Sequence, residues 1–128
     1  MYCIYVVDTF AWIEYFNGSE QGKKAKDYIE GEEIATPSIV IAEFTDKYQR
    51  EKLNPAERLG FIKNKSIIID LNHEIAEIAG RLNSERRKKA KGWGLVDSIV
   101  LATARAQNSK VVTGDDHFRD LDDVVMIT

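Results

Sequence analysis

The stretch "GLVDSIVLATARAQNSKVVTGDDHF", residues 94–118, joins two patterns that together indicate the fold class. Residues 95–108 are largely apolar around the whole helical turn, which predicts a helix at the centre of the molecule. Residues 110–113, "KVVT", form a short β-branched run, which is typical of a strand buried in a parallel sheet. A buried helix that leads directly into a buried strand predicts an α/β fold.

The rest of the chain repeats this alternation. We expect further strands at 2–7, 33–36, 66–70 and 124–127, and further helices at 9–18, 20–31, 37–51, 56–64 and 73–90. Pro37 is expected in the first turn of its helix, a position that tolerates proline. Strands separated by helices predict a three-layer α/β/α sandwich around a central parallel sheet. With no linker and no internal repeat, residues 1–128 are expected to form a single domain.

The composition narrows the class of protein. Hydrophobic residues make up 44% of the chain and charged residues 30%, as in an ordinary globular protein. No apolar run approaches the ~20 residues that span a bilayer, and Asp8 interrupts the apolar N-terminal segment, which argues against a signal peptide. Cys3 is the only cysteine and is expected to be a small core residue on the first strand. One cysteine and two distant histidines do not make a disulfide framework or a zinc site. We therefore expect a cytoplasmic protein.

Four carboxylates are candidates for one site. Asp8 follows the first strand and Asp115 follows the strand at 110–113, and the carboxyl ends of parallel strands share one edge of a sheet. Glu43 and Asp97 have apolar neighbours on their helices, where an unpaired charge is costly. Taken singly, Asp8 and Asp97 can be helix caps and Asp115 a turn residue. Taken together, they predict a site for a hard divalent cation, Mg²⁺ or Mn²⁺, which can assist hydrolysis of a phosphodiester.

The motifs and their order carry a resemblance. "VVDTFAWIEYF" (6–16), "PSIVIAEF" (37–44) and the stretch quoted above resemble the PIN-domain nucleases, in particular the VapC-type toxins of prokaryotic toxin–antitoxin modules. The most specific part is an aspartate that opens an alanine-rich helix and is followed 18 residues later by the first aspartate of "TGDDHF". The resemblance implies a PIN-like fold, metal-dependent endonucleolytic cleavage of RNA, a homodimer, and an antitoxin partner that blocks the site.

The resemblance also implies a role for individual residues. Asp8 and Asp97 correspond to direct metal ligands, and Glu43 and Asp115 to ligands that bind directly or through water. Thr113 corresponds to a hydrogen-bond donor behind them. Because crowded carboxylates disfavour full ionisation, we expect at least one carboxyl pKa to be raised when no metal is bound.

Other residues near the last motif are assigned separately. Asp116 is a candidate additional ligand, whereas His117 is left as a structural loop residue that could also touch a scissile phosphate. The remaining acids of this segment, Asp120, Asp122 and Asp123, are expected to form a solvated loop.

The net charge of −3 argues against extensive binding of nucleic acid, but the segment 81–91 is strongly basic. Such a run is usually a solvated helix end; because it precedes Asp97, it also predicts a cleft rim that binds RNA phosphates. The RNA-binding candidates are Arg86, Arg87, Lys88, Lys89 and Lys91. Trp93 is expected either to stack on a base or to pack in the core or a dimer interface, and Trp12 to lie in the core or that interface.

Several alternatives remain open at this point. A haloacid-dehalogenase-type phosphatase expects a second aspartate where this chain has Phe10, and a receiver domain built on Asp70 expects paired acids that the first strand lacks. A non-catalytic PIN-fold module that binds RNA or protein is a serious alternative, although the presence of all four acids favours catalysis. An RNA-processing nuclease that is not a toxin is the other, although the short chain favours a toxin.

Overall fold

The computed structural model describes residues 5–128, which form one sheet of five parallel strands with helices on both faces. The sheet order is β3-β2-β1-β4-β5. The strands are β1 (Tyr5–Val7), β2 (Ile34–Pro37), β3 (Ile67–Ile69), β4 (Lys110–Thr113) and β5 (Val124–Met126). Every strand pair is parallel, as the sequence predicted.

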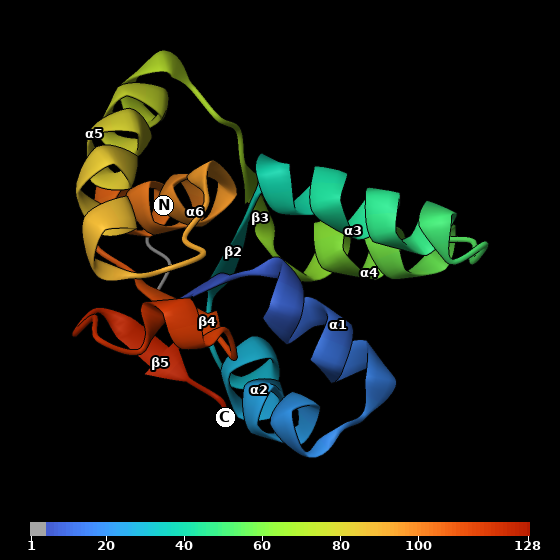
Figure 1. Ribbon diagram of the computed structural model, residues 1–128. Coiled ribbons are helices and arrows are strands. Elements are labelled where there is room, and N and C mark those ends of the chain that lie inside the picture. Colours follow the sequence, from blue (N-terminus) through green and yellow to red (C-terminus); the bar gives the residue numbers. More distant parts are fainter. Residues whose placement is uncertain (1–4) are drawn as a thin grey trace.

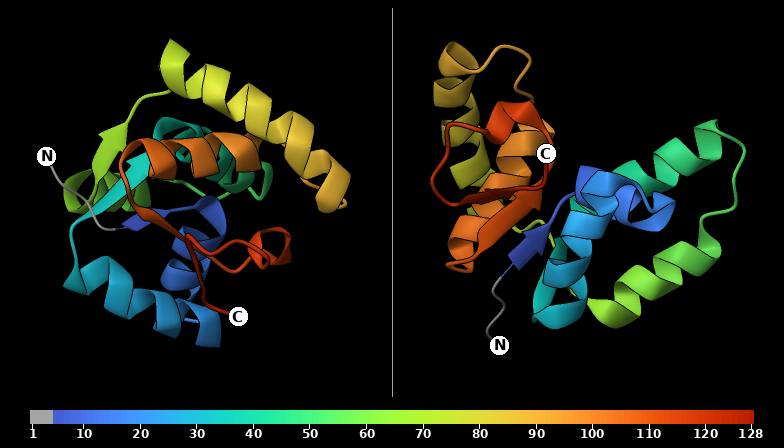
Figure 2. Two further views of the ribbon diagram at one scale, coloured as in Figure 1. Left: turned by 90° about the vertical axis from the view of Figure 1, so that its left-hand side faces the viewer. Right: turned by 90° about the horizontal axis from the view of Figure 1, so that it is seen from below.

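The helices divide into two layers. The first layer holds α1 (Thr9–Asn17), α2 (Glu20–Gly31), α3 (Ser38–Arg50) and α4 (Ala56–Lys65), and the second holds α5 (His73–Lys89) and α6 (Leu95–Ala106). Figures 1 and 2 show these groups on opposite sides of the sheet, with α3 and α4 extending beyond it. The structure therefore confirms the predicted three-layer α/β/α sandwich.

The strand order places a crevice beside β1. The chain passes from β1 to β2 on one side and later returns from β3 to β4 on the other side. When the connections after two adjacent strands run to opposite faces of the sheet, no helix covers the carboxyl ends of those strands. Ligand sites form in the resulting crevice. Asp8 directly follows β1, and Asp115 follows β4 after Gly114. Two of the predicted acids thus flank this point.

Buried apolar residues explain why the central elements form. Val6, Val7, Val111 and Val112 are fully buried on the two middle strands, as expected of strands covered on both faces. Helix α6 buries every residue from 98 to 104, which confirms its predicted central position. Trp12 is fully buried in α1, which confirms its core role, and its Nε1 donates a hydrogen bond to Thr36.

Three details differ from the sequence prediction or lie beyond it. Pro37 ends β2 in register with Ile69 instead of starting a helical turn, because its ψ of 141° is extended. A short 3-10 helix, Asp116–Phe118, forms where only a loop was expected. Cys3 and the first part of the strand predicted at 2–7 lie outside the described residues.

Among the helices of residues 5–128, none is both long and apolar enough to cross a membrane.

Candidate active site

The four predicted carboxylates line one cavity. It has a volume of about 230 Å³ and lies beyond the carboxyl ends of β1 and β4. Its polar wall consists of Asp8, Thr9, Glu43, Asp97 and Asp115, and its apolar wall of Phe10, Ile13, Val96, Val100 and Phe118. Four elements distant in sequence therefore bring acids to the same place, as the sequence predicted.

Asp8 is the most deeply buried of the four acids, with 7% of its surface exposed. It caps helix α1, and its Oδ1 accepts a hydrogen bond of 2.8 Å from the backbone N–H of Ala11. Its pKa is raised from 3.8 to about 7, mainly by burial and also by the nearby charges of Asp115 and Asp97, whereas hydrogen bonds from Thr113 and Ala11 oppose the shift. The predicted rise of a carboxyl pKa is thus confirmed at this residue.

Asp97 is the third residue of α6 and lies beside the cavity at the start of that helix. Its Oδ2 accepts a hydrogen bond of 3.0 Å from the backbone N–H of Gly94. Burial raises the pKa of Asp97, and the charges of Asp115 and Glu43 add to the rise. Two of the four acids are therefore costly to ionise, which is the condition that a bound cation relieves.

Short hydrogen bonds orient the other two acids. Glu43 accepts a bond of 2.6 Å from the hydroxyl of Thr9, which belongs to the helix that Asp8 caps. Thr113 is fully buried; its hydroxyl donates to Asp8 and accepts a bond of 3.0 Å from the backbone N–H of Asp115. Thr113 therefore joins the ends of the two central strands, in the supporting position that the sequence predicted.

Gly114 lets the cavity wall close. A Cβ at this residue would overlap the ring of Phe10, which forms part of the apolar wall. The glycine of "TGDD" is therefore required by close packing, and its backbone does not adopt a positive φ.

His117 belongs to the site, although sequence reasoning left it out. Its Nδ1 lies 3.2 Å from Oδ1 of Asp115 and 4.0 Å from Oδ2 of Asp97. One potential ligand atom from each of these three residues lies within 4.8 Å of the others. The sequence did contain a signal for this position, the spacing of two residues between Asp115 and His117. An aspartate side chain often accepts a hydrogen bond from the backbone N–H two residues later, and this turn brings the two side chains close together.

The other aspartates of this segment do not line the cavity. Asp116 is exposed and pairs with Arg119 at 2.6 Å, so the structure places this candidate ligand in solvent. Asp122 is exposed, as expected of a solvated loop. Asp123 instead forms an ion pair of 2.8 Å with Arg105, which lowers the pKa of Asp123.

The structure contradicts the RNA-binding role predicted for Arg86. The residue is 6% exposed, and its guanidinium donates two hydrogen bonds to Asp120 and one of 2.8 Å to the carbonyl of His117. It also lies 4.5 Å above the ring of Trp93, which is buried in the core and does not offer a face to a base. Arg86 therefore fastens the end of α5 to the 3-10 turn, and Asp120 is its partner rather than a free loop acid.

Two of the other basic candidates, Lys89 and Lys91, lie beside His117. A hollow of about 470 Å³ next to the acid cavity is lined by Lys89, Ala90, Lys91, Asp116, His117, Arg119 and Asp120. The end of α5 therefore lies close to His117. Arg87 and Lys88 are exposed on the same helix end.

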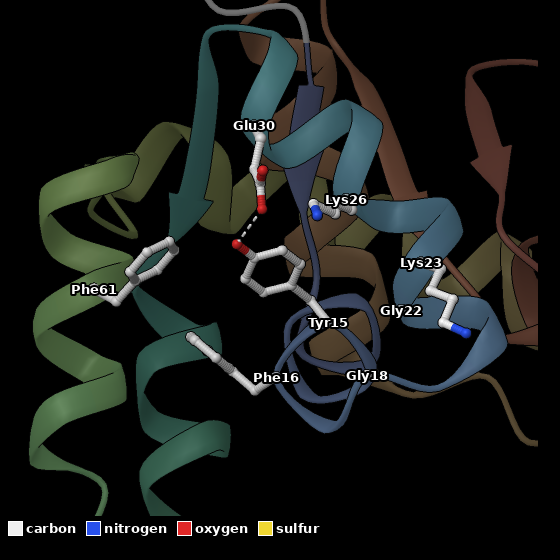
Figure 3. Close-up of a pocket in the computed structure, with 8 residues that line it drawn as sticks. All are labelled: Tyr15, Phe16, Gly18, Gly22, Lys23, Lys26, Glu30 and Phe61. Atoms are coloured by element: carbon white, nitrogen blue, oxygen red, sulfur yellow. Dashed lines mark hydrogen bonds between the residues drawn. The ribbon is translucent and has the colours of Figure 1, made fainter.

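A second concave region lies away from the acids, between α1, α2 and α4. Figure 3 shows the rings of Tyr15, Phe16 and Phe61 around this pocket, with Lys23 and Lys26 along α2. Its volume is about 430 Å³, and Phe61 is 40% exposed. Partly exposed aromatic side chains gathered in a pocket are typical of a surface that binds a protein partner.

The fold and the site together define a class: an α/β/α protein with an acidic cavity beyond the ends of its central strands. The model of the PIN domain family matches residues 5–124, and the chain therefore belongs to the PIN domain family. No curated protein matches the sequence.

Solved structures share the fold. A toxin–antitoxin complex from Klebsiella pneumoniae has a TM-score of 0.76 and 24% identity, over 96% of this chain and 97% of the other. VapC20 of Mycobacterium tuberculosis, a sarcin–ricin loop cleaving toxin, has a TM-score of 0.77 and 16% identity, over 94% and 96%. DNA-bound VapBC from Salmonella typhimurium has a TM-score of 0.73 and 22% identity over the full length of both chains. At these identities the similarity shows the fold.

Proposed function

We propose that the protein is a metal-dependent endoribonuclease and the toxin of a toxin–antitoxin pair. The observation that carries this proposal is the cavity in which Asp8, Glu43, Asp97 and Asp115 meet within a PIN fold. Metal-dependent phosphodiester hydrolysis needs such a concentration of carboxylates, whereas a purely structural role for four acids would leave their mutual repulsion uncompensated. Residues 1–128 act in this proposal as a single domain in the cytoplasm.

The side chains fit Mg²⁺ or Mn²⁺. Carboxylate oxygens are the ligands that both ions accept, and the raised pKa values of Asp8 and Asp97 mark charges that a cation would stabilise. Asp8 and Asp97 are the proposed direct ligands, and Glu43 and Asp115 bind directly or through water. When bound, a divalent cation supplies a Lewis acid and positive charge beside the phosphodiester.

The chain itself prepares the site for that ion. Thr113 connects the carboxylate of Asp8 to the backbone of Asp115, and Thr9 donates a hydrogen bond to Glu43 beside the cavity. The apolar wall of Phe10, Ile13 and Val100 limits the access of bulk water, which strengthens electrostatic interactions with the substrate. The acids are therefore oriented before substrate arrives.

RNA is the proposed substrate because the basic hollow adjoins the acids. Lys89 and Lys91 line it beside His117, so a phosphate backbone held there would continue toward Asp97 and Asp115. Arg87 and Lys88 extend the positive surface along the helix end. We retain these four residues as the RNA-binding set and exclude Arg86.

An antitoxin and a second copy of the chain are the proposed partners. Structures with this fold include toxin–antitoxin complexes, which supports a protein partner for this chain. The aromatic pocket of Figure 3 fits an apolar segment of the antitoxin, and Lys23 and Lys26 favour acidic residues beside that segment. The homodimer is tested by sedimentation equilibrium of the purified chain over a range of concentrations.

The decisive experiment is cleavage of an end-labelled, mixed-sequence single-stranded RNA. Wild type is assayed with Mg²⁺, with Mn²⁺ and with EDTA, beside the Asp8→Asn and Asp97→Asn variants. We expect cleavage to require metal. The cleavage rate should fall at least about a hundredfold in each variant. Asp122→Asn, in the exposed loop, is the matched control and should cleave as wild type does.

Two results contradict the proposal in different ways. A folded wild type that neither cleaves RNA nor binds metal favours the non-catalytic PIN-fold module. Cleavage that persists in both variants places the chemistry at another site or in a contaminant.

A further inference from the structure

His117 is held in place by its neighbours rather than carried on a free loop. Its backbone N–H donates a hydrogen bond of 2.9 Å to Asp115, and its carbonyl accepts one of 2.8 Å from Arg86. The next residue, Phe118, is buried with its ring 4.8 Å from that of Trp93. The turn that carries the imidazole is therefore anchored on both sides.

The ring is oriented as firmly as the backbone. Gly92 has a φ of +86°, and a Cβ at this residue would lie 2.9 Å from Nε2 of His117, so the glycine lets the ring pack against the chain there. The opposite edge of the ring faces the acids, with Nδ1 3.2 Å from Asp115 and 4.0 Å from Asp97.

That nitrogen lacks a conventional partner. Within residues 5–128, Nδ1 of His117 is buried and makes no hydrogen bond, although two carboxylates lie near it. The nearer oxygen, Oδ1 of Asp115, already accepts the backbone N–H of His117. A buried nitrogen that faces two carboxylates without a hydrogen bond is placed as a metal ligand would be.

We propose that Nδ1 of His117 joins Asp97 and Asp115 as a ligand of the divalent cation and makes the site prefer Mn²⁺ to Mg²⁺. The inference rests on the proposed function only in placing a cation at the carboxylates. Mg²⁺ binds oxygen ligands almost exclusively, whereas imidazole nitrogen suits first-row transition metals. One nitrogen among the oxygens therefore discriminates between ions that four carboxylates alone would bind similarly.

The test is the pulsed electron paramagnetic resonance spectrum of Mn²⁺ bound to the protein without RNA. Wild type should show modulation from a directly bound ¹⁴N, and the pattern should change to that of ¹⁵N when only histidine is labelled with ¹⁵N. The chain has two histidines, and His73 begins α5, so His73→Gln should keep the nitrogen signal and His117→Gln should lose it.

Metal affinity gives a second measurement. By isothermal titration of the purified chain, His117→Gln should weaken Mn²⁺ binding by at least about tenfold and change Mg²⁺ binding much less. The labelled wild type keeps the test valid even if His117→Gln does not fold.

The outcomes separate this inference from the proposed function. Bound Mn²⁺ without nitrogen modulation overturns the role of His117 and leaves the carboxylate site intact. Tighter Mn²⁺ binding by His117→Gln also overturns it, because the imidazole would then be an ion-pair partner that competes with the metal. If wild type binds neither ion, the metal site itself fails, and the proposed function fails with it.

Discussion

Asp8 couples the stability of the fold to pH. The pKa of its carboxyl group is about 7 in the folded protein and near 3.8 in the unfolded chain. Between these values the folded state keeps a proton that the unfolded state has released, so the free energy of unfolding falls as pH rises from about 4 to 7. The slope approaches about 1.4 kcal/mol per pH unit without metal.

Asp8→Asn should remove this dependence. Urea denaturation in EDTA should show wild type losing a few kcal/mol, at order of magnitude, between about pH 4.5 and 7.5, and the variant losing much less. The asparagine oxygen can still accept the bond from Ala11, so the helix cap remains. Asp122→Asn should follow wild type. A wild-type stability that does not decline over this range would contradict the buried, high-pKa carboxyl.

Asp97 couples the stability of the fold to the binding of a divalent metal ion. Divalent metal should raise the melting temperature of wild type, by about 5–15 °C when the ion is present at 100 times its Kd. Asp97→Asn should melt above wild type in EDTA, because it removes a partly buried charge, and should respond less to metal. Differential scanning calorimetry measures both effects. Equal metal responses in the two proteins would count against a shared site.

At the scale of single elements, Arg86 attaches α5 to the turn after β4. Arg86→Gln should lower the free energy of unfolding by about 1–3 kcal/mol, because it removes the hydrogen bonds of a buried guanidinium to the carbonyl of His117 and to the exposed carboxylate of Asp120. Arg87→Gln, one residue away on the exposed side, should change stability by less than about 0.5 kcal/mol and weaken RNA binding instead. Chemical denaturation and RNA titration of both variants check the assignment.

The packing of α1 against α2 depends on Gly22. A Cβ at this residue would overlap the backbone of Glu14, so the two helices pack at a distance that only glycine permits. Gly22→Ala should destabilise the protein by about 1–3 kcal/mol in spite of the better helix propensity of alanine. Gly80→Ala is the matched control, because the space around Gly80 is open, and it should be neutral or stabilising by up to about 1 kcal/mol.

Periodicity predicted most of the elements because it reflects burial directly. The ends of the helices fall within about two residues of the predicted ends, and the ends of the strands within about one residue wherever the structure describes them. Pro37 was assigned wrongly because its fixed φ fits both an extended residue and a first helical turn. The order of the strands was beyond sequence reasoning, because it depends on pairing between residues far apart in the chain.

Some residues of the candidate site could be predicted from the sequence and others could not. Acids in apolar surroundings are conspicuous, and Asp8, Glu43, Asp97 and Asp115 do meet. Arg86 was misjudged among neighbouring cations, although it continues the apolar stripe of Ile75, Ala79 and Leu82 at helical spacing. His117 was considered but not assigned to the metal site, because its position depends on a 3-10 turn of three residues, too short to leave a periodic pattern.

At the scale of the whole molecule, charge is separated although the net charge is −3. Positive residues gather at the end of α5 beside the acidic cavity, so RNA binding should weaken as salt competes for the phosphates. In EDTA, replacing Lys89 and Lys91 with glutamine should reduce the slope of log affinity against log salt by about 1 for each phosphate that is no longer bound. Lys24→Gln on α2 should leave the slope unchanged. Equal slopes in all three proteins would place the RNA elsewhere.

The strand order has a consequence for the time at which the acidic cavity is completed during synthesis. Asp8 and Asp115 lie on either side of the junction between β1 and β4, so the earliest and the latest of the four acids in the chain must be brought together. A growing polypeptide lacks this arrangement until β4 has been synthesised and inserted beside β1. The acidic cavity is therefore incomplete in every earlier intermediate. Under the proposed function, a partner has until the last strands fold to reach the toxin.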